Sequence, residues 1–465
     1  MSLEPIGLAT IAIGLLCLWL GQRSASIVFV ATAVFGSAAA VLIGGNNIQP
    51  AHLFLAFLAA TVLLRRQEIA AAIATVRLPE PGFWFACLVV YGVIAAFVLP
   101  RLLAGSTLIV PLGISQYGEV RSMVPLGPVS SNVTQSIYMV ADLICLMLVV
   151  GIASTRDGLR AVTYGLLAYA VANTLFALLD LATYAVGAQR WLDFMRNAKY
   201  TLHNEEEVSG LKRIVGSFTE ASSFARSTLG VLGFTATMWL CGRHVRLTGS
   251  LALASIVLLV LSTSSTAIAG LPVLVVLLYL TAWHVAVVRR RLSSWAVVVL
   301  APVLAGVVIT GILLDNNASA VIGDYIDVTV LNKLSTSSGI ERSLWNTAAL
   351  QNFLDTWGVG VGLGTTRSSN FFLALLSNLG VLGLIFYGLF VYTAFLRPRG
   401  TPHTFPSDVR LAARNACFGL MIGDLLLSPV VDQGLFFYVL AGIAAAVPVR
   451  ARNSEQTLSA RWEAA

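Results

Sequence analysis

Charged side chains are scarce in this chain of 465 residues: Asp, Glu, Lys and Arg make up 11% of it, whereas 57% is hydrophobic. A soluble domain carries roughly 25% charged residues, so the composition excludes a water-soluble globular protein. Apolar runs of about 17–25 residues, long enough to cross a bilayer, recur from end to end. We therefore expect an all-α, polytopic integral membrane protein with a single membrane domain over residues 1–465 and about 12–13 transmembrane helices.

Cysteine pairs and metal-binding motifs are also lacking. The five cysteines lie in or beside apolar runs without CxxC spacing, and the five histidines form no HExxH motif. This pattern argues against a disulfide framework and a zinc site. We expect no metal, no cofactor and no nucleic-acid partner. The lipid bilayer is the expected surroundings of the chain.

Basic clusters orient the predicted spans. They fall at 65–77, 156–160, 243–246, 289–291, 397–414 and 450–461. Each is separated from the next by two spans, as expected if all face the cytoplasm. We therefore expect a cytoplasmic C-terminus, an external N-terminus and a first span that is retained. The candidate spans are 6–21, 26–43, 48–64, 82–100, 132–153, 160–187, 218–240, 249–264, 267–288, 293–314, 369–396, 411–428 and 433–449.

Three long loops then face outward, at about 101–131, 188–217 and 315–368, and they contain every lysine of the chain. Topology disfavours basic residues on that side, which suggests an anionic partner there. The alternative is that long loops translocate whatever their charge.

The last of these loops contains a predicted helix over 339–357. Ser338 and Glu341 have capping-box spacing, and Gly358 stands where a C-cap belongs. Its apolar face comprises Leu344, Ala348, Leu350, Phe353, Leu354 and Trp357, and its polar side carries Glu341, Arg342, Asn346 and Asp355. We expect an amphipathic helix lying on the outer membrane face.

The stretch GVGVGLGTTRSSN, 358–370, follows this helix. It satisfies neither the dinucleotide nor the Walker pattern. The glycines Gly360, Gly362 and Gly364 would still let backbone N–H groups approach an anion, and Arg367 would add bidentate phosphate geometry. The alternative is a flexible joint between a surface helix and a span.

A second polar stretch, KRIVGSFTEASSFAR, covers 212–226 where the chain re-enters the membrane. It contains Lys212, Arg213, Ser217, Glu220 and Arg226. Charged groups at such a position need a partner or a polar cavity. We interpret the stretch as an anion-binding arginine beside a carboxylate base, with a structural Glu220–Arg226 pair or snorkelling as the alternative.

Three acids, Asp142, Asp180 and Asp424, fall inside or near spans and are candidates for proton relay. The serine- and threonine-rich turn LSTSSTAIAG, 261–270, is interpreted as polar contacts between membrane helices.

Several of these segments resemble one family. The run from Arg342 through GVGVGLGTTRSSNFFLALLSNLGVLGLIFYG resembles the signature region of the O-antigen ligase/polymerase superfamily. RIVGSFTEASSFA is similar to its R-x-x-G-x-F element, and LSTSSTAIAG to its serine-rich turn. The resemblance covers roughly 200–395 and is closest to exopolysaccharide and O-antigen polymerases of the Wzy type.

The resemblance implies an inner-membrane glycosyltransferase that joins glycans at the periplasmic face, with inverting, metal-independent chemistry. The donor would be a saccharide on undecaprenyl pyrophosphate, and a chain-length regulator and a flippase would be partners. It implies that Arg213, Arg342 and Arg367 grip the pyrophosphate. Asn370 stands at the head of the late span in the family pattern, and we add it to the substrate-binding residues with Ser217, Lys212 and the glycines.

Glu220 is the predicted general base, with Asp324 and Asp327 in reserve. Ser369 stands where ligases of the family typically carry His, which favours a polymerase. The alternatives are a WaaL-like ligase that transfers glycan to the lipid A core of lipopolysaccharide, and a transporter or flippase for lipid or polysaccharide.

Overall fold

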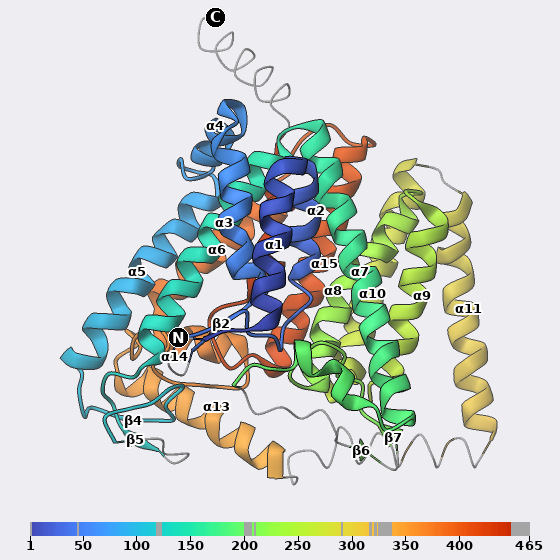
Figure 1. Ribbon diagram of the computed structural model, residues 1–465. Coiled ribbons are helices and arrows are strands. Elements are labelled where there is room, and N and C mark those ends of the chain that lie inside the picture. Colours follow the sequence, from blue (N-terminus) through green and yellow to red (C-terminus); the bar gives the residue numbers. More distant parts are fainter. Residues whose placement is uncertain are drawn as a thin grey trace, which may run out of the picture.

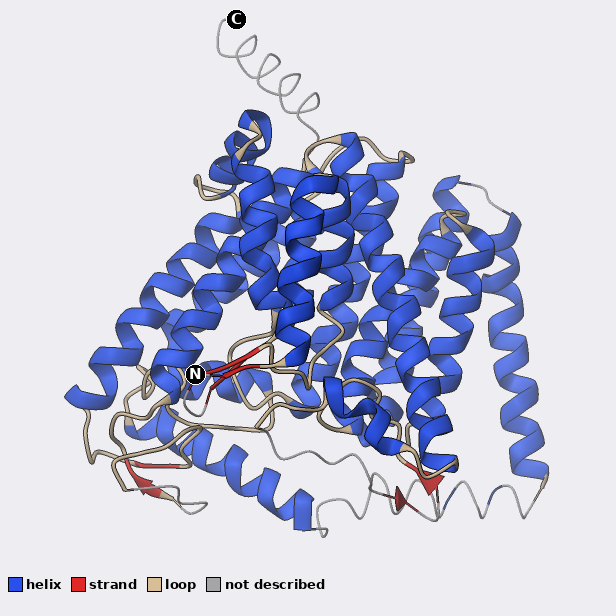
Figure 2. Ribbon diagram, in the orientation of Figure 1, coloured by secondary structure: helices blue, strands red, loops and turns tan. Residues whose placement is uncertain are grey.

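The computed structural model describes residues 2–43, 46–117, 123–199, 207–208, 211–289, 292–315, 319, 323 and 337–447. Within these residues the chain is a bundle of long helices with a few short strands (Figures 1 and 2). The reserve bases Asp324 and Asp327 lie outside the described residues.

The helices follow the apolar runs of the sequence. They are α1 Pro5–Leu20, α2 Gln22–Thr32, α3 Pro50–Leu63, α4 Arg66–Thr75, α5 Pro81–Leu102, α6 Ser131–Ala153, α7 Arg156–Ala185, α8 Ala221–Leu240, α9 Val245–Leu261, α10 Ser265–Arg289, α11 Leu292–Leu314, α13 Ser337–Asp355, α14 Phe371–Val391, α15 Phe405–Leu427 and α16 Leu435–Ala445. A 3₁₀ helix covers Gln189–Met195, and a π-helical turn, Tyr392–Leu396, ends α14.

Three small antiparallel sheets join these helices. β1 (Ser2–Leu3), β2 (Val41–Ile43) and β3 (Asn46–Ile48) pair in the order β1-β2-β3, with Leu42 opposite Asn47. β4 (Leu108–Ile109) pairs with β5 (Val124–Pro125), and β6 (Glu207–Val208) with β7 (Leu211–Lys212).

Six helices of the described residues are long and apolar enough to span a membrane. They are Pro81–Leu102, Ser131–Ala153, Arg156–Ala185, Ser265–Val288, Ser294–Leu314 and Phe371–Leu396. Four shorter apolar helices, α1, α3, α9 and α16, accompany them. The expectation of an all-α membrane protein is thereby confirmed.

Two predicted spans are wrong in extent. Residues 26–43 do not form one helix, because α2 ends at Thr32 and the chain runs on into β2. The backbone N–H of Ser37 donates to the Ser217 carbonyl at 3.0 Å, and the Ser37 carbonyl accepts from the N–H of Ala198 at 3.2 Å, so tertiary hydrogen bonds replace helical ones. The predicted span 433–449 is reduced in the described residues to the short α16, preceded by the non-helical segment Ser428–Gly434.

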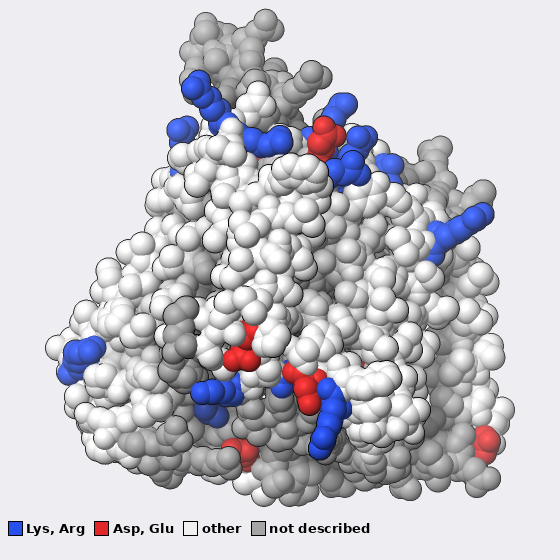
Figure 3. Space-filling view, viewed as in Figure 1, with Lys and Arg blue, Asp and Glu red and all other residues white. Residues whose placement is uncertain are grey.

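The bundle has two different ends. The start of α4 and the start of α7 lie at the end drawn uppermost in Figure 1, here called the upper face. α13, β4 and β5 lie at the opposite end, the lower face. Figure 3 shows Lys and Arg along the upper rim, flanks with few charged residues between the ends, and a second group of mixed charges lower down.

Close helix packing positions the centre of the bundle. A Cβ on Gly233 of α8 would lie 2.7 Å from the carbonyl oxygen of Asn415 in α15, and one on Gly419 would lie 2.6 Å from that of Leu229. Small residues let membrane helices approach in this way. α8 and α15 therefore pack backbone against backbone, and their polar side chains meet inside the bundle.

Candidate functional site

One side of α13 contacts the polar segments predicted as the site. The Arg342 guanidinium lies 3.8 Å from the Glu220 carboxylate, at the N-cap of α8. Both side chains are about a quarter exposed, 25% and 28%. Two predicted site residues from distant parts of the sequence are thus brought together, in an ion pair too long for a hydrogen bond.

The next turn of α13 meets the segment after the glycines. The Arg367 guanidinium lies 5.1 Å from the ring centroid of Trp345, a cation–π contact, and it also donates to the Leu112 carbonyl at 3.3 Å. The Asn346 side-chain oxygen accepts from the backbone N–H of Ser369 at 2.8 Å. Arg342, Trp345 and Asn346 share one helix face because of their i, i+3, i+4 spacing.

The other side of α13 is exposed and carries large apolar side chains. Leu344, Leu350 and Leu354 are exposed, beside the exposed polar residues Ser343, Thr347 and Gln351. Trp357, just after the helix, is 94% exposed, whereas Ala349 and Asn352 are fully buried. The helix therefore presents several large apolar side chains outward. This orientation suits a helix at a membrane surface.

Most backbone N–H groups of the glycine segment are already used inside the protein. Gly360 donates its N–H to the Thr356 hydroxyl at 3.0 Å, and Gly362 donates to the Asn378 carbonyl at 2.9 Å. The N–H groups of Val361, Thr365 and Arg367 are likewise donated within the protein. The assignment of the Gly360 and Gly362 backbone to anion binding is therefore corrected.

The glycines serve close packing instead. Gly360, Gly362 and Gly364 have φ of 89°, 101° and 75°, which favours glycine. A Cβ on Gly362 would lie 2.7 Å from the Ala95 carbonyl oxygen of α5, and one on Gly364 would lie 2.6 Å from that of Ser131. The segment therefore packs tightly against α5, α6 and Gly380, whose non-helical backbone interrupts α14, and is not a flexible joint.

Lys212 belongs to a buried charge cluster. Its Nζ lies 2.8 Å from Asp180 Oδ1, and the Arg196 Nη2 lies 2.7 Å from the same oxygen. The backbone N–H groups of Val215 and Gly216 donate to Asp180 Oδ2 at 2.9 and 3.1 Å. Asp180 therefore fixes the turn before α8, and Lys212 is part of that structural cluster rather than a substrate ligand.

Two more predicted ligands have structural roles. Ser217 is fully buried and donates to the Val34 carbonyl at 2.8 Å. Asn370 caps α14, accepting from the N–H groups of Phe372 and Leu373, and donates to the Leu425 carbonyl at 2.7 Å. Arg213 is half-buried after β7 and interacts within the fold.

Arg226 pairs with Asp424 of α15 and not with Glu220. Its Nη2 lies 2.9 Å from Asp424 Oδ2 and donates to the Gln433 carbonyl at 2.8 Å. Gln433 also donates to Asp424 at 3.0 Å and accepts from the Tyr387 hydroxyl at 2.8 Å. The alternative of a Glu220–Arg226 pair is therefore wrong.

A second buried polar group lies beside this network. Among the described residues, no hydrogen-bond donor reaches either carboxyl oxygen of the fully buried Asp142, and neither ring nitrogen of His52 has a partner. Asp432, on the segment between α15 and α16, is close enough to Asp142 for an electrostatic interaction. Two carboxyl groups can bond only if one carries a proton, so a hydrogen bond between them would require a shared proton.

Sequence reasoning missed Trp345, Gln433 and Asp432. A polar pair between two apolar runs, as in SPVVDQG, is a signal for an interrupted membrane helix. The ring of Trp345 has no comparable signal, because its role depends on where α13 docks.

Among the described residues, no group of His, Cys, Asp and Glu is arranged to hold a metal ion. Comparison of the chain with protein-family models finds no match, and comparisons with curated proteins and with solved structures find none either.

Proposed function

We propose that the protein is a bacterial inner-membrane glycosyltransferase of the O-antigen ligase/polymerase superfamily, which polymerises undecaprenyl-pyrophosphate-linked repeats into surface polysaccharide. The observation that carries the proposal is the docking of α13. One of its faces contacts Glu220 through Arg342 and Arg367 through Trp345. Two of the three segments that carry the sequence resemblance, 212–226 and the run from Arg342 through Arg367, thus meet at α13.

The arrangement of the ends supports a periplasmic site. Arg65, Arg66, Arg156 and Arg160 gather on the upper face, as the positive-inside rule requires of a cytoplasmic side. The lower face, with α13 and the long loops, is then periplasmic. In this orientation α16 ends on the cytoplasmic side. The four shorter apolar helices, together with α8, α15 and the short α2, bring the six spans to about 12–13 crossings.

The proposed chemistry follows from the Glu220–Arg342 pair. The pyrophosphate of the donor displaces Glu220 from Arg342, which stabilises the charge that develops on the leaving group. The released Glu220 carboxylate takes the proton of an acceptor hydroxyl. That oxygen bonds to the anomeric carbon as the bond from this carbon to the pyrophosphate oxygen breaks, with inversion. Arg367 and Arg213 supply further positive charge.

The test uses lipid-linked repeats isolated from a strain that lacks the protein. Purified wild-type protein in nanodiscs should convert them into a ladder of longer products. Arg342→Gln and Arg367→Gln should lower the rate by about 10²–10³, the usual cost of losing one charge-stabilising donor. Arg246→Gln, at an exposed arginine at the start of α9, is the matched control. If wild-type protein forms no ladder, the polymerase proposal fails. If it instead transfers preformed polymer to lipid A core, the protein is a ligase.

A transporter or flippase is the second candidate, and the buried Asp142 with the neighbouring, partly exposed Asp432 favours it. Transporters place ionisable groups on interrupted helices within the membrane, and Asp432 lies between α15 and the short α16. Proton uptake by reconstituted liposomes upon addition of the lipid-linked repeat, without any ladder, would support this candidate over the polymerase.

A further inference from the structure

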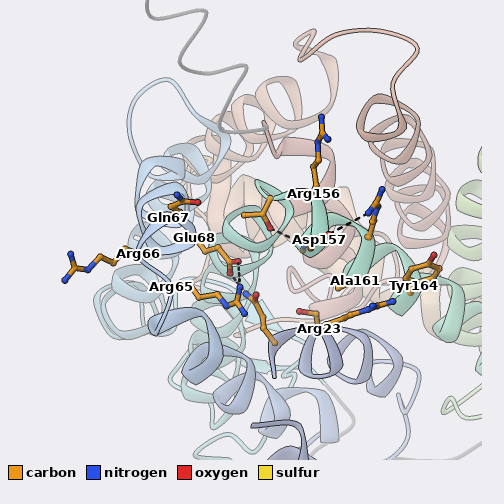
Figure 4. A pocket seen from close by; sticks show the side chains of 14 residues that line it. Arg23, Arg65, Arg66, Gln67, Glu68, Arg156, Asp157, Ala161 and Tyr164 are labelled. Atoms are coloured by element: carbon orange, nitrogen blue, oxygen red, sulfur yellow. Dashed lines mark hydrogen bonds and ion pairs between the residues drawn. The ribbon is translucent and has the colours of Figure 1, made fainter. Parts of the chain in front are cut away.

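The upper face contains a cavity far from the proposed active site. It has a volume of about 950 Å³ and lies between α2, the start of α4 and the start of α7 (Figure 4). Small-molecule sites commonly have volumes of 300–1,000 Å³. Two of the basic clusters identified in the sequence, 65–77 and 156–160, contribute arginines to its lining, but nothing in the proposed glycan chemistry uses it.

The lining is strongly basic. Five arginines contribute to it, against the two carboxylates of Glu68 and Asp157. The arginines are Arg23, Arg65, Arg66, Arg156 and Arg160. In Figure 4, Arg23 and Arg65 lie between the helix ends, whereas Arg66 and Arg156 extend outward. The positive-inside rule explains basic residues on this face, but it does not require them to surround a cavity.

The carboxylates neutralise little of this charge. Glu68 is buried, with 3% of its side chain exposed, and accepts a hydrogen bond from the Gln22 amide. Its nearest arginine, Arg65, is 3.9 Å away. Asp157 is 96% exposed and lies 3.7 Å from Arg160. Both ion pairs are longer than a charge-assisted hydrogen bond, so an anion with better geometry can displace them.

Helix ends add to the positive potential. α2, α4 and α7 begin at Gln22, Arg66 and Arg156, so three N-termini converge on the cavity. The N-terminus of a helix carries roughly half a positive charge and unpaired N–H groups. Such ends attract phosphate groups.

A buried hydroxyl gives an independent indication of a ligand. Ser26 lines the cavity and is fully buried, and its Oγ has no hydrogen-bond partner among the described residues. A buried serine within a helix usually donates to the carbonyl four residues earlier, as Thr10 does to Ile6 at 2.7 Å. The Ser26 hydroxyl is therefore an unpaired polar group in the wall of the cavity.

We propose that this cavity is a binding site for a phosphate-bearing anion, held by Arg23, Arg65 and Arg160 and the Ser26 hydroxyl. The anion is either the head group of an anionic phospholipid or a soluble phosphorylated compound. The two share the chemistry that the lining recognises. The site is separate from the proposed glycosyltransferase site, and its occupancy does not depend on that function.

The test measures binding of two probes to the full chain. Radiolabelled inorganic pyrophosphate is titrated by equilibrium dialysis against protein in phosphatidylcholine nanodiscs. Retention of phosphatidylglycerol is measured by native mass spectrometry after reconstitution in mixed nanodiscs. Binding of the first probe identifies a soluble ligand, and selective retention of the second identifies a lipid. Either supports the proposal, and failure of both overturns it.

Two sets of variants distinguish specific binding in the cavity from non-specific attraction by the positive charge of the upper face. Arg23→Gln/Arg65→Gln/Arg160→Gln should weaken binding by at least about tenfold, or 1.4 kcal/mol. The control Arg77→Gln/Arg246→Gln/Arg397→Gln removes equal charge at exposed positions outside the cavity lining and should leave binding within about twofold. Equal loss in both sets would overturn the proposal.

A milder variant covers the case in which the triple change disrupts folding. Ser26→Ala removes one hydroxyl and no charge. It should weaken binding of the successful probe severalfold, with an unchanged elution volume. Unaltered affinity in Ser26→Ala, together with a misfolded triple variant, would also overturn the assignment.

Discussion

Arg226 of α8 donates to the Asp424 carboxylate of α15 through both Nε and Nη2. Its Nη2 also donates to the backbone carbonyl of Gln433. The arginine side chain is 19% exposed and the aspartate side chain 3%. One guanidinium therefore ties together two packed helices and the non-helical segment that follows α15. The pair therefore holds the segment that contains Asp432 against α8 and α15.

Removing one partner of this pair should be costly. Arg226→Met leaves the Asp424 carboxylate buried without its cation, and we expect a loss of about 3–5 kcal/mol in the free energy of unfolding. Asp424→Leu should cost a similar amount. The double variant should lose less than the sum, because no unpaired charge remains.

Unfolding by dodecyl sulfate in mixed micelles measures these changes. Arg246→Met, at an exposed arginine at the start of α9, is the control and should change the unfolding free energy by less than about 0.5 kcal/mol. If the loss of unfolding free energy in the double variant equals the sum of the two single losses, the two side chains do not act as a pair.

The glycine segment provides a second prediction. A Cβ on Gly362 would lie 2.7 Å from the Ala95 carbonyl, at a φ of 101°. Gly362→Ala should therefore destabilise the protein by about 1–3 kcal/mol through strain and overpacking. Gly388→Ala in α14 is the matched control, since a Cβ there meets nothing within 4 Å.

Thermal unfolding and the KM of the two variants show whether Gly362 serves packing or ligand binding. We expect Gly362→Ala to lose stability, while its folded fraction keeps the wild-type KM for the lipid-linked donor. A stable Gly362→Ala with a raised KM would restore the phosphate interpretation of the glycines.

The sequence predicted α13 well because its signals are local. A capping box at Ser338 and Glu341 and a following apolar face predicted 339–357, and the helix observed is Ser337–Asp355. Apolar composition likewise identified the membrane helices, since burial in lipid is decided residue by residue.

The ion-pair and hydrogen-bond partners of individual residues were harder to predict, because they depend on how the helices pack. Glu220 and Arg226 are close in sequence, yet Glu220 meets Arg342 and Arg226 meets Asp424. The role of Gly360 also depends on distant groups: its N–H is donated inside the fold, and a Cβ there would press on the Asn378 backbone. Such facts follow from tertiary structure, which glycine spacing does not encode.

Glu68 gives a prediction about pH. It lies in α4, outside the candidate spans, and burial raises the pKa of its carboxyl, against the opposing effects of Gln22 and Arg65. A group with a raised pKa in the folded state contributes stability that is present below its ordinary pKa of 4.5. That stability is lost as the pH rises through the folded pKa.

The stability of wild-type protein relative to Glu68→Gln should therefore fall between acidic and neutral pH. Melting temperatures of both proteins at matched pH values test this. Asp157→Asn, which removes a largely exposed carboxylate on the same cavity, is the matched control variant. A difference between wild type and Glu68→Gln that does not change with pH would mean that Glu68 keeps its ordinary pKa.

The pair Asp142–Asp432 gives the last prediction, and it bears on both candidate functions. If the two carboxyl groups share one proton, an amide at position 142 can donate to Asp432 as the protonated acid does. Asp142→Asn should then leave the unfolding free energy within about 1 kcal/mol of wild type, whereas Asp142→Leu should cost about 1–3 kcal/mol because Asp432 loses its donor.

Activity of the well-folded Asp142→Asn variant separates the functions. A polymerase that uses Glu220 as its base should keep its product ladder. A transporter that loads and releases the shared proton should lose proton uptake, because an amide cannot titrate. Strong destabilisation by Asp142→Asn would instead mean that Asp142 is ionised and balanced by a cation, and the shared-proton interpretation would be wrong.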